Sequence, residues 1–234
     1  MTVFEELKER VWKANCDLVR HGLVILTFGN TSGADRTAGV AAIKPSGVSY
    51  EDMTPNDIVV VDFEGKTVEG RLAPSSDTAA HLEIYKAFSE VEGVVHAHSP
   101  YATAFAQAGR EIPCLGTTHA DHFHGPVRLA RPLTREEVES DYERNTGRAV
   151  VDSFRGHDPM TVPAVLAPGH GPFVWGKTPE EAVQNAVALE FTARAAFLAL
   201  TLNPEASALP EFILNKHYQR KHGPRAYYGQ KKES

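Results

Sequence analysis

Two histidines on one short apolar segment are the first sign of chemistry in this chain. The segment is Val94-Val95-His96-Ala97-His98-Ser99, and its apolar beginning is typical of a buried β-strand. Side chains alternate between the two faces of a strand, so His96 and His98 should point the same way. Neutral imidazole is the commonest nitrogen ligand of divalent transition metals. The pair therefore predicts part of a metal site, although two hydrogen-bonded core histidines would give the same pattern.

A complete metal site needs further ligands, and three other residues are candidates. His170 lies in a Gly-His-Gly turn directly after an apolar run, where it is either a ligand or a turn histidine satisfied by the backbone. Asp77 begins a predicted helix, where its carboxylate could bind a metal or simply complement the helix dipole. His81, one turn later on the same face, could be a ligand or a partner that orients one. Three imidazoles with one carboxylate suit Zn²⁺, and Mn²⁺, Co²⁺ or Ni²⁺ could occupy the same site.

Three short segments have the composition of an anion-binding site. Each combines small and hydrogen-bonding residues near the end of a predicted strand or the start of a helix, and together they contain Gly29, Asn30, Lys44, Ser46, Gly47, Ser75 and Ser76. Backbone amides at helix starts, hydroxyls and a lysine are groups that bind phosphate. Each segment alone would be explained by turn formation and helix capping. Their occurrence in one chain favours a phosphate pocket.

Two further residues are candidates for proton transfer. Asp121 lies in the run Thr117-Thr118-His119-Ala120-Asp121-His122, which is too polar for a plain loop. A carboxylate there could exchange a proton with a substrate near the metal, or it could form an Asx-type turn. Tyr228 lies in a basic tail, which the sequence alone would assign to a disordered terminus.

The pattern of apolar residues predicts one α/β domain, a mixed central sheet covered by helices on both faces. Predicted helices cover residues 4–21, 74–88, 100–109 and 178–202, and another helix starts at residue 134. Predicted strands cover residues 23–27, 40–43, 57–63, 67–69, 94–99, 112–115 and 162–167. No linker divides residues 1–234, and a basic tail from about residue 216 closes the chain.

Composition and charge narrow the class of protein. The 234 residues are 42% apolar and 23% charged, with a net charge of −6, which is typical of a soluble globular protein and argues against nucleic-acid binding. The apolar run at residues 186–202 is interrupted by Glu190 and Arg194, so we predict a core helix rather than a membrane span. Two cysteines are too few for a disulfide framework, and the N-terminal pattern is not that of a signal peptide. These features predict a cytoplasmic protein.

Taken in chain order, the segments resemble the class II aldolase/epimerase/adducin-head family over almost the whole sequence. The resemblance is carried by LTFGNTS (26–32), IKPSGV (43–48), PSSDT (74–78), HAHS (96–99), GTTHAD (116–121), GHGPF (169–173) and the tail from Lys216 to Gln230. Aldolases of this family carry Glu at the position of Asp77, and epimerases carry Asp. The Thr-Thr-His-Ala-Asp run and the Tyr-Tyr-Gly-Gln tail also resemble the epimerases.

The resemblance implies roles for these residues. It implies a zinc ion bound by Asp77, His96, His98 and His170, and a phosphate pocket formed by Gly29, Asn30, Ser46, Gly47, Ser75 and Ser76, with Lys44 close by. It also implies a cyclic homotetramer with active sites between neighbouring subunits. Asp121 and Tyr228 would be an acid/base pair that reaches a neighbour's metal, supported by His217, and the tail at about 216–234 would contribute to the subunit interface.

The activity implied is the interconversion of L-ribulose 5-phosphate and D-xylulose 5-phosphate, by retro-aldol cleavage and re-addition at the C3–C4 bond. Related epimerases of this type serve arabinose and ascorbate catabolism. The first alternative is a class II sugar-phosphate aldolase, against which Asp77 argues. The second is a metal-free interaction module like the adducin head, which would leave the histidines and Asp77 unexplained.

Overall fold

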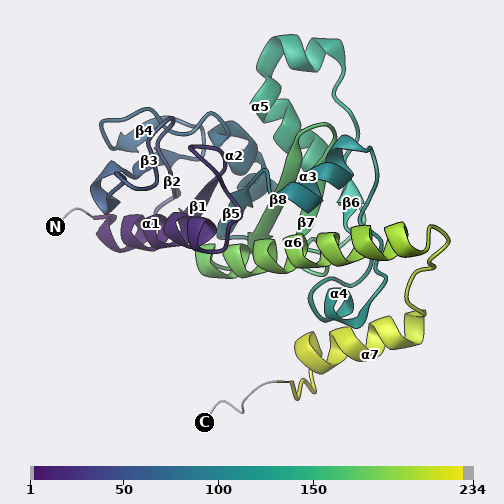
Figure 1. Cartoon of the computed structure of the whole chain (residues 1–234). Coiled ribbons are helices and arrows are strands. Elements are labelled where there is room, and N and C mark those ends of the chain that lie inside the picture. Colours follow the sequence, from purple (N-terminus) through teal and green to yellow (C-terminus); the bar gives the residue numbers. More distant parts are fainter. Residues whose placement is uncertain (1–2, 229–234) are drawn as a thin grey trace.

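The computed structural model describes residues 3–228 of the chain (Figure 1). The strands in this range are β1 (Asn30–Asp35), β2 (Val40–Ile43), β3 (Val59–Asp62), β4 (Thr67–Glu69), β5 (Gly93–His96), β6 (Arg128–Leu129), β7 (Ala164–Ala167) and β8 (Gly171–Gly176). Among the described residues these eight strands form one sheet in the order β4-β3-β2-β1-β5-β8-β7-β6. Neighbours are antiparallel except β6 and β7, which are parallel. The sheet is therefore mixed, as predicted.

Helices cover both faces of this sheet. They are α1 (Glu5–Arg20), α2 (Thr78–Ala87), α3 (Pro100–Gln107), α4 (Thr117–His122), α5 (Arg135–Asp152), α6 (Pro179–Leu202) and α7 (Glu211–His222), with one 3₁₀ turn, η1 (Pro55–Asp57). Helices α1, α3 and α6 pack on one face, and α2 and α5 pack on the other. Figure 1 shows α4 and α7 beyond α6, at one end of the molecule.

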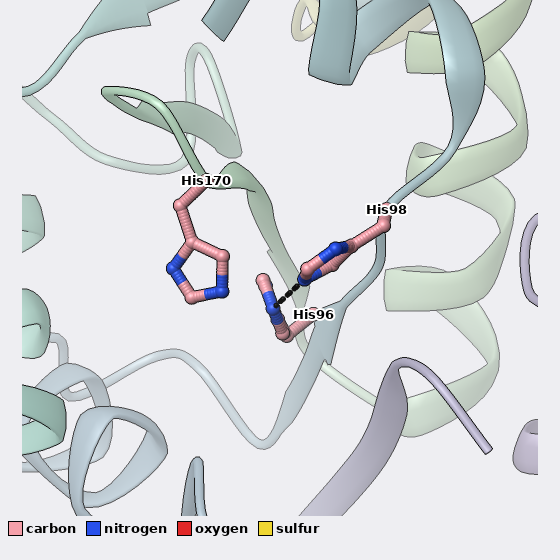
Figure 2. Close-up of side chains that lie close together, drawn as sticks. All are labelled: His96, His98 and His170. Atoms are coloured by element: carbon pink, nitrogen blue, oxygen red, sulfur yellow. Dashed lines mark hydrogen bonds between the residues drawn. The ribbon is translucent and has the colours of Figure 1, made fainter. Parts of the chain in front are cut away.

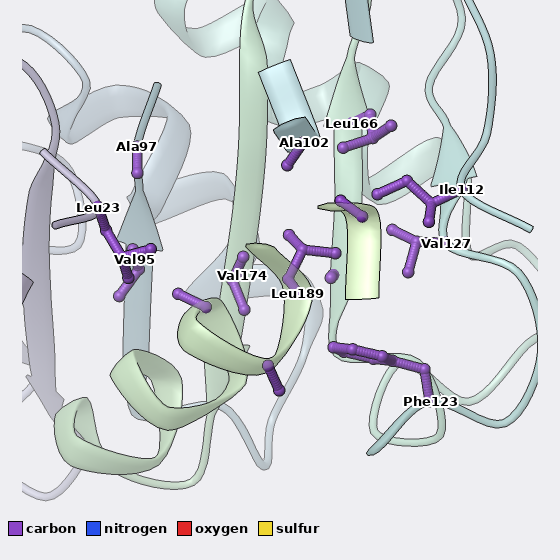
Figure 3. Packing of buried hydrophobic residues seen from close by; sticks show 14 of the residues in the cluster. Leu23, Val95, Ala97, Ala102, Ile112, Phe123, Val127, Leu166, Val174 and Leu189 are labelled. Atoms are coloured by element: carbon purple, nitrogen blue, oxygen red, sulfur yellow. The ribbon is translucent and has the colours of Figure 1, made fainter. Parts of the chain in front are cut away.

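The alternation of side chains along the strands produces a core on each face. On β5, Val95 faces the core shared with α3 and α6, whereas Val94 faces the core shared with α2 and α5. On β8, Val174 joins the first core and Trp175 the second. Figure 3 shows the first core, in which the strand residues Val95, Val174 and Leu166 meet Leu189 of α6. Burial on both faces fixes the register of the central strands.

Leu166 provides a test of the packing in the first core. Its side chain on β7 is fully buried, so Leu166→Ala removes apolar contacts and leaves a cavity. We expect the variant to lose about 2–5 kcal/mol of unfolding free energy, measured by urea denaturation. Leu72→Ala, at a position that is 40% exposed, is the matched control and should change stability much less. Equal losses in the two variants would contradict this description of the core.

Most predicted elements are confirmed. The predicted first helix is α1, which ends at Arg20 with His21 as its C-cap. Gly22 follows with a φ of 67°, a conformation that favours glycine. The predicted strands at 40–43 and 67–69 have the observed bounds of β2 and β4. The helix starts predicted at residues 134 and 178 are the N-caps Thr134 and Thr178 of α5 and α6, where each side-chain oxygen accepts a hydrogen bond from the amide three residues later.

Several predicted elements were wrong. Residues 23–27 are irregular, with a turn at 26–27, rather than a strand, and β1 begins after them at Asn30. The predicted strand at 112–115 is reduced to one bridge, between Ile112 and Val127. Strands β6 and β8 and helix α4 were not predicted, and α7 takes up much of the predicted tail. Residues 229–234 of that tail lie outside the described residues.

Helix α6 is the element that could be mistaken for a membrane span. Among the described residues, it is the one helix long and apolar enough to cross a membrane. In the fold, however, it packs along β5 and β8, and Ala182, Ala186 and Leu189 of one face are buried in the first core. One face of α6 therefore contributes to the core, as the sequence analysis predicted.

Candidate active site

One pocket gathers the residues that the sequence analysis assigned to metal and phosphate binding. It has a volume of about 370 Å³ and lies where β1 and α2 begin and where β2 and β5 end. Its lining includes His96, His98, His170, Asp77, Gly29, Asn30, Lys44, Ser46, Gly47, Ser75 and Ser76. Thr27, Phe28 and Pro45 complete it. The structure thus brings together eleven of the fourteen residues to which the family resemblance gives roles, and the other three, Asp121, His217 and Tyr228, lie elsewhere in the described chain. His81, the further candidate ligand, does not line the pocket.

The three histidines form a tight cluster (Figure 2). One ring nitrogen from each lies within 4.8 Å of one from each of the others. The Nε2 atoms of His96 and His98 are 3.0 Å apart, and the ring centroid of His170 lies 4.6 Å from that of His96 and 4.9 Å from that of His98. Convergent imidazoles at this spacing form a set of nitrogen donors that suits a divalent transition metal.

The sheet register explains how His170 reaches the pair from 72 residues away. His96 is the last residue of β5, and it pairs with Phe173 of β8. The turn between β7 and β8 contains His170 and therefore lies beside the end of β5. His98 lies beyond β5 rather than on it, so the prediction of one strand carrying both side chains was wrong in this detail. The two imidazole rings nevertheless point toward the same place, as the sequence analysis predicted.

Hydrogen bonding and burial prepare His96 to act as a ligand. Its Nδ1 lies 3.0 Å from the carbonyl oxygen of Pro172, so Nδ1 carries the proton and donates it, which leaves the Nε2 lone pair free. Burial lowers the pKa of His96 to about 3, despite the opposing effect of Asp77. Burial also lowers the pKa of His170. The Nδ1 atom of His170 is buried and has no hydrogen-bond partner among the described residues. Neutral imidazoles fit a metal site.

Asp77 supplies a negative charge at the edge of this cluster. Its carboxylate lies outside the tight triangle of imidazoles but lines the same pocket. Oδ2 accepts a hydrogen bond of 2.7 Å from Nδ2 of Asn30. Burial opposes ionisation of Asp77, but the neighbouring His96 and His81 and the Asn30 hydrogen bond hold its pKa below the usual value. Asp77 is therefore an anion that faces a set of neutral imidazoles.

The phosphate-type segments form the other part of the pocket. Gly29 has a φ of 79°, and a Cβ there would lie 2.9 Å from the carbonyl oxygen of His96, so only glycine allows this approach. Gly47 has a φ of 68°. Lys44 is 2% exposed, and its Nζ donates to the Val48 carbonyl at 2.7 Å. Burial lowers the pKa of Lys44. This buried cation lies beside exposed hydroxyl and amide groups, which is the composition of an anion site.

Asp121 of α4 and Tyr228, which follows α7, both contact Arg220 of α7 in a second cluster. The guanidinium of Arg220 donates to both carboxylate oxygens of Asp121, at 2.9 and 2.6 Å, and Nδ1 of His217 lies 3.1 Å from Oδ1. Burial opposes ionisation of Asp121, but these two partners lower its pKa. Arg220 also lies 4.9 Å from the ring centre of Tyr228, whose side chain is 60% exposed.

The sequence analysis missed Arg220, which links the proposed acid/base pair. A usable signal was present, because His217 and Arg220 are three residues apart and share one face if that segment is helical. Because the chain from about residue 216 was predicted to be a tail and not a helix, this spacing was not used. Asp121 lies in helix α4, not in a loop or an Asx-type turn, and its partners lie about 100 residues away in the chain.

Comparisons with known proteins agree with this arrangement. The chain is 51% identical to L-ribulose-5-phosphate 4-epimerase UlaF of Salmonella paratyphi B, over 97% of this chain and the whole of that protein. Among solved structures, an L-fuculose 1-phosphate aldolase has a TM-score of 0.78 and 27% identity, covering 92% of this chain and 95% of its own. L-fuculose-1-phosphate aldolase of Thermus thermophilus has a TM-score of 0.65 and 27% identity, with coverages of 87% and 98%. Residues 9–197 match the model of the class II aldolase and adducin N-terminal domain, and the chain belongs to this family.

Proposed function

We propose that this chain is an L-ribulose-5-phosphate 4-epimerase that depends on a divalent metal, with zinc as the proposed ion. The observation that carries the proposal is the single pocket lined by His96, His98 and His170 together with the phosphate-type segments. Such a pocket suits a small substrate with a phosphate group and with oxygens that a metal can bind. The 51% identity to an epimerase supports a phosphorylated ketopentose as that substrate. We expect the enzyme to act in the cytoplasm, in a pathway such as arabinose catabolism.

The three imidazoles would hold the metal, and Asp77 would complete or orient the site through its charge. When bound, a divalent cation supplies Lewis-acid polarisation of a substrate oxygen. The carbonyl oxygen of Pro172 accepts a hydrogen bond from Nδ1 of His96 and so fixes the tautomer of that ring. Hydrogen bonds of this kind orient metal ligands. Asn30 fixes the Asp77 carboxylate in the same way.

The phosphate would bind to Gly29, Asn30, Ser46, Gly47, Ser75 and Ser76, with the charge of Lys44 nearby. These groups would keep hold of the phosphorylated fragment during the reaction. Retention is essential for an epimerase, since the fragment must return to the carbon that it left.

The reaction breaks the C3–C4 bond and forms it again. Removal of the proton from the C4 hydroxyl gives an aldehyde at C4, glycolaldehyde phosphate, while the bonding electrons pass to C3 and give the enediolate of dihydroxyacetone. The aldehyde turns over, C3 attacks its opposite face, and the new C4 oxygen takes up a proton. No atom is gained or lost. Two proton-transfer groups are needed, one for each face of the aldehyde.

We assign these two groups to Asp121 and Tyr228 of a neighbouring subunit in a cyclic homotetramer. Within one described chain, neither residue lines the pocket of the histidines. The tetramer proposal is supported by apolar side chains that α6 and α7 leave exposed: Phe191, Phe197, Leu198, Leu202 and Phe212. Residues from about 216 onward would form part of the interface and carry the acid/base pair across it. His217 and Arg220 would hold Asp121 in place.

The alternative is a class II sugar-phosphate aldolase, which would release the two fragments. Its support is the structural similarity to two L-fuculose-1-phosphate aldolases. Those proteins are 27% identical to this chain, about half the identity to the epimerase. We therefore favour the epimerase. A non-catalytic module like the adducin head would leave the cluster of neutral imidazoles without a purpose.

Lys44 provides a test of the phosphate end. Lys44→Met keeps the length of the side chain and removes its charge, so we expect KM for the phosphorylated substrate to rise about 10- to 100-fold, the equivalent of roughly 1.5–3 kcal/mol for a charged hydrogen bond. Zinc content should be unchanged by elemental analysis. Lys66→Met, in the exposed turn before β4, is the control for loss of one positive charge. An unchanged KM in Lys44→Met would remove Lys44 from the phosphate site.

The activity itself is tested by a coupled assay. Zinc-loaded protein is supplied with L-ribulose 5-phosphate, and formation of D-xylulose 5-phosphate is followed with a coupling enzyme. We expect turnover, its loss on chelation of the metal, and its recovery when zinc is added back. Absence of turnover by the metal-loaded protein would contradict the proposed substrate.

A further inference from the structure

The phosphate pocket is built from three segments that are separate in the chain, and hydrogen bonds join them. The amide of Ser75 donates to the carbonyl oxygen of Lys44 at 3.0 Å, which links the second segment to the third. Nδ2 of Asn30 donates to Oγ of Ser75 at 3.1 Å, which links the first segment to the third. The side chain of Tyr50 contacts both the first segment, at Gly29, and the second, at Lys44. Tyr50 itself does not line the pocket.

The phenol of Tyr50 fixes the first segment. Its O–H donates to the carbonyl oxygen of Gly29 at 2.8 Å, with the carbonyl oxygen of Phe28 as a second acceptor at 3.3 Å. Burial raises the pKa of Tyr50, so the phenol keeps its hydrogen and stays a donor. Tyr50 is 8% exposed and belongs to a core cluster with Met53 and Val60, so the position of this donor is itself fixed by packing.

The carbonyl groups that face Tyr50 determine where the adjoining amide points. In a trans peptide the C=O and the following N–H lie on opposite sides of the chain, and no cis peptide occurs among the described residues. The N–H of Gly29, which follows the Phe28 carbonyl, is therefore directed away from Tyr50. Within residues 3–228 this N–H has no hydrogen-bond partner, and Gly29 lines the pocket. It is a backbone donor of the kind that binds phosphate.

The ring of Tyr50 supports the second segment. Nζ of Lys44 lies 4.7 Å from the centre of this ring, within the range of a cation–π contact. The same ammonium group donates to the carbonyl oxygens of Val48, at 2.7 Å, and Pro45, at 3.4 Å. These contacts fix the ammonium group of a residue that lines the pocket, where a phosphate would meet its charge.

We propose that Tyr50 is a positioning residue of the phosphate pocket: its O–H orients the Gly29 segment and its ring places the Lys44 ammonium group, so that one buried side chain sets the two in register. The inference rests on the proposed function and adds a residue to the phosphate end of that site. In this role Tyr50 contacts neither the phosphate nor the metal. Its loss should therefore weaken phosphate binding and leave zinc binding unchanged.

The first test measures binding of inorganic phosphate, without turnover. Phosphate is titrated by calorimetry into the full-length, zinc-free protein, so the metal cannot be its ligand. Tyr50→Phe keeps the ring and removes the O–H, and we expect the Kd for phosphate to rise roughly 3- to 10-fold, as for loss of one neutral hydrogen bond. Tyr85→Phe is the matched control, because it removes a fully buried phenol that contacts Ser32 and does not line the pocket.

The outcomes of this titration are distinct. The Kd for phosphate should be unchanged in Tyr85→Phe, and an equal rise in both variants would overturn the inference, because any lost buried phenol would then have the same effect. An unchanged Kd in folded Tyr50→Phe would overturn the inference and leave the proposed function intact. A wild type without saturable phosphate binding would overturn the inference together with the phosphate pocket on which it rests.

The contribution of the ring is tested by Tyr50→Met, which fills the buried site without an aromatic face. The Kd for phosphate should rise a further 2- to 10-fold, roughly, beyond that of Tyr50→Phe, because the cation–π contact with Lys44 is lost as well. Folding is checked by circular dichroism, and Tyr50→Leu replaces a variant that does not fold. Equal Kd values with and without the ring would overturn the role assigned to it.

Steady-state kinetics separate positioning from a general loss of structure. In Tyr50→Phe the KM for L-ribulose 5-phosphate should rise by about the same factor as the Kd for phosphate, whereas kcat and zinc content should stay close to the wild type. This split is expected because the phosphate is bound equally in the ground state and the transition state. A fall in kcat or in zinc content with an unchanged KM would indicate a structural role alone and overturn the inference.

Discussion

Replacing His96 by Asn is expected to remove bound zinc and epimerase activity together. His96 is buried, its Nε2 is directed to the other imidazoles, and its Nδ1 is already committed to Pro172. A Lewis acid supplies several kcal/mol of transition-state stabilisation, so activity should fall by at least about 1,000-fold. Zinc content is measured by elemental analysis and activity by formation of D-xylulose 5-phosphate.

The matched control for this variant is His157→Asn, which changes an exposed histidine outside the pocket. It should keep both zinc and activity. If His96→Asn kept its full zinc content, the assignment of His96 as a ligand would be wrong. If it lost zinc but kept activity, the metal would have no role in the reaction.

Asp121→Asn and Tyr228→Phe are expected to lose most turnover while they keep zinc. Each removes one proton-transfer group and leaves the cluster of three histidines untouched, since neither residue lines that pocket in the described chain. General acid/base catalysis contributes about 10²- to 10⁴-fold, and we expect losses of kcat in this range. Tyr227→Phe is the control for Tyr228, because it removes the neighbouring phenol. Wild-type turnover in both Asp121→Asn and Tyr228→Phe would remove the assignment.

The same variants test whether one active site is shared between subunits. A mixture of His96→Asn and Asp121→Asn protein, unfolded and refolded together, should recover part of the activity that each lacks alone. Recovery is expected because some sites would combine an intact histidine cluster from one subunit with an intact Asp121 from its neighbour. No recovery from a properly assembled mixture would place the two clusters in separate roles.

Local patterns in the sequence were sufficient for much of the fold and for the choice of site residues. The apolar periodicity of α1 and the helix starts at Thr134 and Thr178 depend on interactions within a few residues of the chain, and all three were predicted correctly. The convergence of His96 and His98 also depends on residues close in sequence. Such features can be derived from one sequence because the interactions that fix them are local.

The parts that were missed depend on contacts between distant segments. Strand β8 carries Phe173, Val174 and Trp175, a β-type run, but glycine and proline residues interrupt the pattern on its N-terminal side. Only its pairing with β5 and β7 shows that it is a central strand. Helix α7 likewise has no buried residues among those described. Because it has no face packed in the core, its sequence lacks a clear apolar pattern. Its position becomes clear from its contacts with α4, such as the ion pair between Arg220 and Asp121.

The most direct test of the central claim is one ³¹P NMR time course. L-Ribulose 5-phosphate is supplied to the zinc-loaded protein, and the signals of D-xylulose 5-phosphate and glycolaldehyde phosphate are followed together. We predict that the D-xylulose 5-phosphate signal grows while no free glycolaldehyde phosphate accumulates, because the phosphate pocket retains the fragment until the bond forms again. Accumulation of free glycolaldehyde phosphate would contradict the account and identify the enzyme as an aldolase.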